Sequence, residues 1–261
     1  MRIVVCVKQV PDTTDVKVDP VKGTLVREGV PSMINPFDQF ALEEGLRVRD
    51  QAGGELVVLS MGPPQAKSVV MLSLAIGADR GVLLTDRAFA GADTLATSYT
   101  LSKAIEKVGD VDLVVCGLQA IDGDTAQVGP GIATRLGLPQ VTYAERIEMA
   151  DGRLRARRAI EEGNETVEAR LPALVTMTTP SDFVPTNPPF TRIMKAKNKP
   201  YEEWAAADIG ADPARLGLDG SATWVERVYP PPMRERGEMI GGSPDEAVAC
   251  LIDVLKRERV L

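Results

Sequence analysis

Histidine is absent from this 261-residue sequence, and cysteine is scarce. Without histidine, Ser-His-Asp and Cys-His catalysis are excluded, together with most zinc sites. The three cysteines, Cys6, Cys116 and Cys250, are far apart and none of them pairs at metal-ligand spacing. Cys6 and Cys116 lie in apolar, strand-like runs, where a thiol behaves as a small hydrophobic group. An iron–sulfur centre would therefore have to lie in another protein.

Long apolar runs and basic blocks are also missing. No apolar stretch approaches the ~20 residues that a membrane-spanning helix needs. The short run at residues 3–7 is typical of a buried strand rather than of a signal peptide, so we expect a cytoplasmic protein without membrane insertion. The net charge is −7 and lysine and arginine are scattered, which argues against a nucleic-acid partner.

The first half of the chain alternates between short apolar runs and longer helical patterns. Strands are expected at 3–7, 56–60, 82–84 and 113–116, and helices at 36–52, 64–76, 92–108 and 124–136. Nearly continuous apolar strands are typical of a parallel sheet that is covered on both faces. The alternation therefore predicts a doubly wound, mostly parallel α/β fold of the Rossmann-like kind.

Two segments interrupt this alternation. Residues 16–18 and 24–26 flank a turn sequence and predict a β-hairpin after the first strand. Further on, strand-like runs at 141–148, 154–160, 166–171 and 173–177 are separated by turn signals. We expect these four runs to form antiparallel strands that extend one edge of the sheet.

The composition changes near residue 180. We place the α/β nucleotide-binding domain at 1–180 and a proline-rich arm with a C-terminal helix at 181–261. Ser243 and Pro244 predict the start of that helix, and Ala247, Leu251 and Leu255 would form an apolar stripe along it. Two interpretations stay open: the arm embraces a partner subunit, or it packs back on its own domain.

The most informative segment is the loop after the strand at 113–116, which runs from Gly117 to Pro130. In open α/β sheets, ligands bind beyond the carboxyl ends of the strands, where helix N-termini point. Asp124 or Thr125 can cap the next helix, and Gly123 permits a close approach of phosphate to the backbone. The loop lacks the Walker A and GxGxxG motifs, and a simple capped strand-to-helix turn is the alternative.

Five ordered motifs resemble the β subunit of electron-transfer flavoproteins over nearly the whole chain. They are Val7–Asp12, Asn35–Phe37, Gly77–Gly81, Gln119–Gly129 and Ile193–Lys197. The resemblance implies a heterodimer with an α subunit and an adenine nucleotide held by this chain. The implied cofactor-binding residues are Cys6, Val7, Asn35, Pro36, Phe37, Asp38, Met61, Gly117, Gln119, Asp122, Gly123, Asp124, Thr125, Ala126, Gln127, Val128 and Gly129. It implies no catalytic side chain and no metal ligand.

The same resemblance divides the family by its nucleotide. One type holds a structural AMP in a loop similar to Asp-Asp-Asp-Cys/Thr-Asn-Gln-Thr-Gly. The other holds a second FAD and performs electron bifurcation, and its loop is similar to the Asp122–Pro130 sequence found here. The resemblance thus implies FAD that accepts a hydride from NADH and sends electrons to the α-subunit FAD and to a low-potential acceptor such as ferredoxin. The AMP-holding carrier subunit is the alternative.

One segment departs from the family pattern. AMP-type members resemble Asn-Glu-Pro-Arg-Tyr-Pro-Ser-Leu in a loop that docks on acyl-CoA dehydrogenases, whereas residues 181–192 here lack that leucine. Phe183 or Phe190 could replace it as an apolar anchor for a dehydrogenase, or could belong to a local core. A third interpretation of the whole chain is a nucleotide-sensing module, similar to universal stress proteins, without a redox role.

Overall fold

The computed structural model describes residues 1–12, 31–150, 152–226, 237 and 239–261. Within it the chain forms two compact units, residues 1–226 and residues 227–261. The hairpin expected at 16–18 and 24–26 lies outside the described residues. Whether residues 181–226 act with the C-terminal unit as an arm around a partner stays a prediction.

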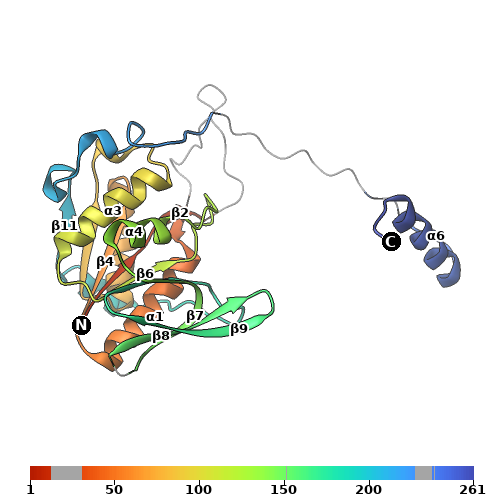
Figure 1. The fold of residues 1–261 in the computed structure, drawn as a ribbon, viewed down its shortest axis with the longest axis horizontal. Coiled ribbons are helices and arrows are strands. Elements are labelled where there is room, and N and C mark those ends of the chain that lie inside the picture. The colour runs from red at the N-terminus through yellow and green to blue at the C-terminus, as the bar shows by residue number, and fades with distance from the viewer. Residues whose placement is uncertain (13–30, 151, 227–236, 238) are drawn as a thin grey trace. The chain divides into compact units, whose positions relative to one another are not determined.

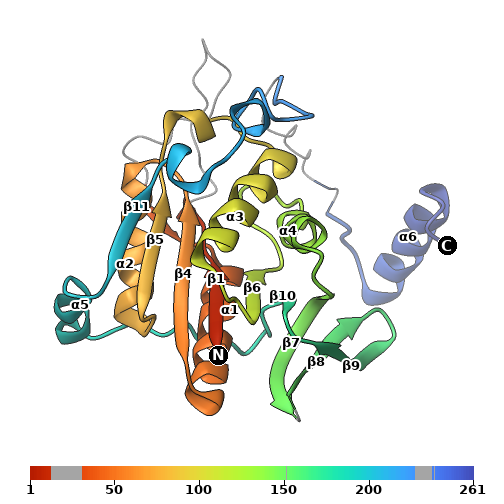
Figure 2. The ribbon, with the colours of Figure 1, turned by 60° about the vertical axis from the view of Figure 1, so that its left-hand side comes forward.

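A mostly parallel sheet dominates the first unit (Figures 1 and 2). Nine strands of the described chain form it in the order β11-β5-β4-β1-β6-β10-β7-β8-β9. Their bounds are β1 Arg2–Cys6, β4 Glu55–Met61, β5 Arg80–Leu84, β6 Leu113–Gly117, β7 Gln140–Ala150, β8 Arg153–Ile160, β9 Gly163–Arg170, β10 Ala173–Met177 and β11 Tyr201–Trp204. A separate antiparallel pair joins β2 Gln9–Pro11 to β3 Ser32–Ile34. The predicted Rossmann-like α/β fold is thereby confirmed.

The centre of the sheet is apolar on both faces because helices cover each side. Val5 of β1 lies opposite Val58 of β4 and Val115 of β6 in parallel register. One face packs against α1 (Pro36–Ala52) and α2 (Lys67–Ile76). The other packs against α3 (Thr94–Val108) and α4 (Val128–Leu136). Figure 2 shows the two helix layers on either side of the strands.

The antiparallel extension is confirmed for three of the four predicted strands. β7 pairs with β8, and β8 with β9, in antiparallel register. The fourth prediction is wrong, because β10 lies inside the sheet and runs parallel to both β6 and β7. All five β10 residues are buried, from Ala173 to Met177, as a strand covered on both faces requires.

The helices follow the predicted pattern, but three of the four begin later than expected, α3 by two residues at Thr94. α1 begins at Pro36 after the N-cap residue Asn35, as expected. A short 3₁₀ turn at Pro64–Ala66 precedes α2, so the segment expected to be one helix is divided. The helix expected at 124–136 begins only at Val128, and its N-cap is Gln127. Asp124 and Thr125 are therefore loop residues and do not cap this helix.

The proline-rich segment adds structure to the first unit. α5 (Phe190–Ala196) packs against α2, and β11 joins the outer edge of the sheet beside β5. Trp204 at the end of β11 is buried, and Lys107 lies over its ring at 4.3 Å. Short 3₁₀ turns at Ala207–Ile209 and Pro213–Arg215 follow β11.

The second unit contains α6 (Pro244–Arg257). Its start has the predicted form. Ser243 precedes Pro244 and makes a reciprocal capping box with Glu246. Val248, Leu251 and Ile252 are exposed on this helix. Among the helices of the described chain, none combines the length and apolar character required for a transmembrane span.

Candidate functional site

The residues implied as cofactor ligands gather at the carboxyl edge of the sheet. Cys6 ends β1 and Val7 follows it, Gly117 ends β6, and Met61 ends β4 beside β1. The start of α1 and the loop after β6 meet at the same edge, because Asn35 bonds to that loop. This is the edge at which open α/β sheets bind their ligands.

The loop between β6 and α4 has an unusual backbone. Asp124 and Ala126 have left-handed conformations, with φ of 48° and 52°. Neither is glycine, so each position costs about 1–2 kcal/mol that the surrounding structure must offset. Alternation of right-handed and left-handed residues turns successive N–H groups toward one point and forms an anion-binding concavity. The strain therefore lies where a phosphate site is expected.

The backbone N–H groups directly after the left-handed Asp124 are free of hydrogen bonds to the described chain. In the part of the chain that the structure describes, the backbone N–H groups of Thr125, Ala126 and Gln127 donate no hydrogen bond to another residue. At the N-terminus of α4, Val128 and Gly129 add N–H groups that have no intrahelical partner. The helix dipole adds partial positive charge at this end. The donor set thus suits the phosphate groups of a nucleotide.

Asn35 fixes the first half of the loop. It is fully buried, and its side-chain amide donates to the carbonyl of Gln119 at 2.8 Å. Its side-chain oxygen accepts from the N–H of Ile121 at 3.1 Å, and its own N–H donates to the carbonyl of Lys8 at 2.9 Å. Asn35 makes no side-chain cap for α1, because the loop uses both polar atoms of its side chain.

The polar side chains of the loop are engaged with neighbouring residues. Asp122 accepts from Lys8 Nζ at 2.6 Å, and Asp124 accepts from the Gln119 amide at 2.9 Å. Gln127 accepts from the Thr94 hydroxyl at 2.8 Å, which ties the end of the loop to the start of α3. Asp124, Thr125 and Gln127 are all exposed, and among the described residues the Thr125 hydroxyl has no hydrogen-bond partner.

Asp38 connects β1 to β6 from the first turn of α1. Its carboxylate accepts from the N–H of Lys8 at 2.8 Å and lies against Gly117 at the end of β6. Burial raises the pKa of Asp38 to about 7, although the Asn35, Lys8 and Gly117 contacts act in the opposite direction. Asp38 therefore holds together the residue after β1, the start of α1 and the end of β6.

Two cysteines lie beneath this edge on neighbouring strands. Cys6 and Cys116 are opposite each other in the parallel register of β1 and β6, and both are buried. The adjacent Cys6 thiol, together with burial, raises the pKa of Cys116 well above its usual range. The Cys116 thiol is therefore protonated, and both side chains are buried, as the sequence predicted.

The remaining implied residues have distinct surroundings. Val7 is buried and donates its N–H to the carbonyl of Leu59, whereas Pro36 and Phe37 are half-buried at the start of α1. Met61 packs against the core beneath α3. Gly129 lies close to β10, where a Cβ would overlap the side chain of Thr176.

Gly123 differs from the other loop glycines. A Cβ at this position would have no atom within 4 Å, and the backbone is outside the left-handed region. The fold therefore accepts a side chain at residue 123. Folding therefore does not require glycine at this position, and its absence of a side chain leaves open space beside the loop.

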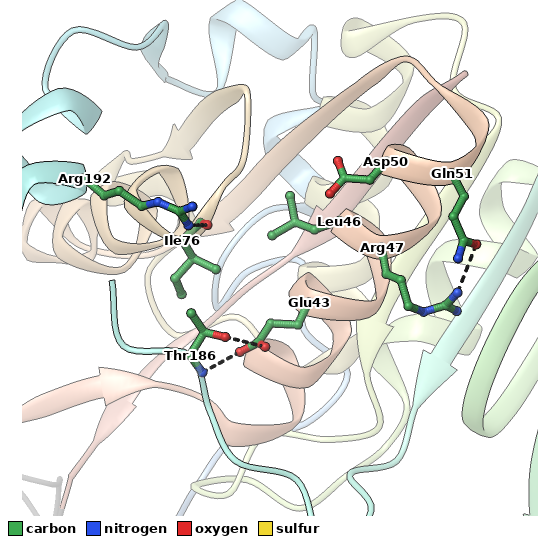
Figure 3. A pocket seen from close by; sticks show the side chains of 8 residues that line it. All are labelled: Glu43, Leu46, Arg47, Asp50, Gln51, Ile76, Thr186 and Arg192. Atoms are coloured by element: carbon green, nitrogen blue, oxygen red, sulfur yellow. Dashed lines mark hydrogen bonds between the residues drawn. The ribbon is translucent and has the colours of Figure 1, made fainter. Parts of the chain in front are cut away.

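A surface hollow of about 460 Å³ lies elsewhere, beside the second half of α1 (Figure 3). Its lining consists of Glu43, Leu46, Arg47, Asp50, Gln51, Ile76, Thr186 and Arg192. Glu43 accepts from both the N–H and the hydroxyl of Thr186, at 2.8 and 2.7 Å. Arg47 is paired with Glu44 and Gln51. The polar groups around the hollow are thus paired with one another. The bonds between Glu43 and Thr186 connect α1 to the segment before α5.

Comparison with known proteins assigns the class. Residues 22–209 match the electron transfer flavoprotein domain family. The chain belongs to the electron transfer flavoprotein β-subunit family, whose members serve electron transfer. It is 51% identical to "Electron transfer flavoprotein subunit beta" of Clostridium acetobutylicum, over the full length of both chains. It is 48% identical to "Caffeyl-CoA reductase-Etf complex subunit CarD" of Acetobacterium woodii, again over both full lengths. It is 46% identical to "Protein FixA" of Azorhizobium caulinodans, over 99% of this chain and 95% of that protein.

Two residues of this site carried no predicted role. Lys8 belongs to the Val7–Asp12 motif, and Thr94 was expected only near a helix start. The sequence could have indicated a role for Lys8 through its position just after a buried strand, because side chains there reach the carboxyl edge of the sheet. Its partner Asp122 is 114 positions away in the sequence, so the pairing required the structure.

Proposed function

We propose that this chain is the β subunit of a heterodimeric, electron-bifurcating flavoprotein that holds FAD at the carboxyl edge of its sheet. The observation that carries the proposal is the run of free N–H groups from Thr125 to Gln127, next to the left-handed residues Asp124 and Ala126. Such a run, continued by the N-terminus of α4, offers phosphate groups a fixed set of donors.

The open space at Gly123 favours FAD over AMP. The fold permits a side chain there, yet the sequence has none. An aspartate at this position would add a negative charge and bulk beside the phosphate donors. Because an uncompensated charge near a partly buried anion costs energy of kcal/mol scale, its absence favours the larger, doubly phosphorylated nucleotide. The names of CarD and FixA among the relatives accord with a specialised role rather than with a general carrier.

Each implied residue then has a part in binding. The backbone of Cys6 and Val7, with Pro36, Phe37 and Met61, would border the adenine. Gly117, Gln119, Asp122 and Asp124 would shape the loop, while Thr125–Gly129 would supply donors to phosphate and ribose. Asn35 and Asp38 would hold the strand ends and the loop in place.

The proposal includes further components. Family membership implies an α-subunit partner, which would carry the other FAD. Bound FAD supplies the redox chemistry, accepting a hydride from NADH and passing single electrons to the α-subunit FAD and to a low-potential acceptor such as ferredoxin. A dehydrogenase would receive the electrons that the α-subunit FAD collects, and we place the complex in the cytoplasm. The protein contributes position and electrostatic environment, so no side chain is assigned a catalytic role.

Counting the cofactors tests the proposal. The heterodimer is purified after co-expression, its cofactors are extracted, and FAD and AMP are quantified per heterodimer. Two FAD supports the proposal, whereas one FAD with one AMP contradicts it and favours a non-bifurcating carrier. A colourless complex without flavin would instead favour the nucleotide-sensing interpretation.

A matched pair of variants sharpens this test. Gly123→Asp introduces the residue of AMP-type loops, and Gly241→Asp makes the same change at another open, non-left-handed glycine, in the second unit. Gly123→Asp should lower the FAD content toward one per heterodimer, while the unfolding temperature of the nucleotide-free protein stays unchanged. Gly241→Asp should retain both FAD. Equal FAD content in the two variants would contradict the role of Gly123.

A further inference from the structure

A single ion pair connects the end of β1 to the loop after β6. Lys8 Nζ lies 2.6 Å from Asp122 Oδ1. The side chain of Asp122 is only 11% exposed, whereas that of Lys8 is 44% exposed. The carboxylate is thus largely withdrawn from water, and Lys8 provides its positive partner.

This pair stands next to the proposed phosphate donors. Asp122 precedes the free N–H groups of Thr125–Gln127 by three residues. A carboxylate with little exposure is poorly screened by solvent, so it repels a nearby phosphate strongly unless a cation neutralises it. The other acidic residue of the loop, Asp124, is exposed, and its carboxylate accepts from the neutral side-chain amide of Gln119. Asp122 is therefore the acid of this loop whose charge most needs compensation.

We propose that Lys8 is a charge-compensating residue that neutralises Asp122, so that the phosphate of an adenine nucleotide can lie beside the loop. Lys8 acts through Asp122 and not as a phosphate ligand. The proposal rests on the proposed function only in requiring a phosphate-bearing adenine nucleotide, and AMP and FAD both satisfy it.

This role predicts a specific pattern among variants. Lys8→Met leaves Asp122 as an uncompensated charge, so nucleotide affinity should fall about tenfold or more. Asp122→Asn removes the charge that requires compensation, so its affinity should fall clearly less than that of Lys8→Met. The double variant should bind better than Lys8→Met alone. Lys8→Arg keeps the positive charge and should bind as the wild type does.

The experiment uses the co-expressed heterodimer. Its adenine nucleotides are removed by dialysis against a chaotropic salt, and FAD and AMP are titrated in separate series by calorimetry. The unfolding temperature of each nucleotide-free variant is recorded to confirm that it folds. Should Lys8→Met fail to fold, the comparison of Asp122→Asn with the double variant replaces it, and the two should then bind equally.

Three outcomes would overturn the inference. Lys8→Met could bind as tightly as the wild type. The double variant could bind no better than Lys8→Met, as expected of a direct phosphate ligand. Asp122→Asn could lose as much affinity as Lys8→Met, as expected of a purely structural latch. A wild-type complex that binds AMP but not FAD would contradict the proposed function and leave this test intact.

Discussion

Gly117 at the end of β6 lies against Asp38 in the first turn of α1, so closely that a Cβ on Gly117 would overlap the Asp38 carboxylate. The same Cβ would come within 2.7 Å of the carbonyl carbon of Phe37. The backbone conformation of Gly117 is not left-handed, so contact alone requires glycine here. The start of α1 is therefore seated on the end of β6.

Gly117→Ala should destabilise the protein by about 1–3 kcal/mol, because the added methyl group must displace α1 or Asp38. Gly123→Ala, at the open position of the same loop, should leave the free energy of unfolding nearly unchanged. Urea denaturation of both variants measures the difference. If the two variants had equal free energies of unfolding, α1 and β6 would be packed less closely than the structure shows.

Asp38 should make stability depend on pH. Its folded pKa is about 7, above the ordinary value of 3.8, so between these values the folded protein holds a proton that the unfolded chain releases. The contribution of Asp38 is therefore fully present below about pH 4, declines as pH rises through about 7, and is constant above that. Asp38→Asn has no proton to lose and should flatten this part of the profile. Urea denaturation from pH 4 to 8 for both proteins checks it, and parallel profiles would contradict the assignment.

Asn35→Ala should loosen the loop. The substitution leaves the carbonyl of Gln119 and the N–H of Ile121 without their partner, at a cost of about 1–3 kcal/mol. Nucleotide content of the purified heterodimer should fall with it. Asn187→Ala, which alters an exposed asparagine, serves as the control. Hydrogen exchange of the Ile121 amide reports the loop directly; unchanged protection in Asn35→Ala would refute the role of this side chain.

The two candidate anchor phenylalanines have different surroundings. Phe183 packs edge-on against Phe40, with ring centroids 4.9 Å apart, whereas Phe190 is 73% exposed. Phe183→Ala should therefore lower stability by about 1–3 kcal/mol through lost burial. Phe190→Ala should keep its stability and lose the proposed dehydrogenase partner. Denaturation and co-purification separate the effects, and full capture by Phe190→Ala would discard its docking role.

The three thiols should differ in reactivity. Cys250 is exposed, whereas Cys6 and Cys116 are buried, with the pKa of Cys116 raised. A thiol reagent added to the folded chain should modify one cysteine quickly and the other two only after unfolding. Cys250→Ser should abolish the fast phase. A fast phase that persists in this variant would place Cys6 or Cys116 within reach of solvent.

The central sheet could be predicted from the sequence because its strands are short, nearly continuous apolar runs between helical patterns. Leu113–Cys116 is an example, since every residue of that run is buried. β10 was misassigned because a run such as Ala173–Met177 reads the same whether it pairs in parallel or antiparallel fashion. Only distant partners decide that direction, and the local sequence does not contain them.

The place of the loop after β6, at the carboxyl edge of the sheet, was predictable, but its contacts with other elements were not. Strand ends and glycines drew attention to this loop, and its role as a cofactor site stays a prediction that the family resemblance implies. The start of α4 was predicted four residues early, because Asp124 and Thr125 are good cap residues. Left-handed backbone at Asp124 and Ala126 overrides that preference. Contacts such as Asn35 with Gln119 join residues 84 positions apart, which no local pattern encodes.

The placement of β11 has a consequence for biosynthesis. Arg80 of β5 pairs with Glu202 of β11 across 122 positions of sequence. While the ribosome is still making the intervening chain, β5 presents an unpaired strand edge, which is a template for pairing with another nascent chain. Completion of that edge must await the emergence of residues 201–204, so β5 stays an open edge until most of the sheet has been synthesised.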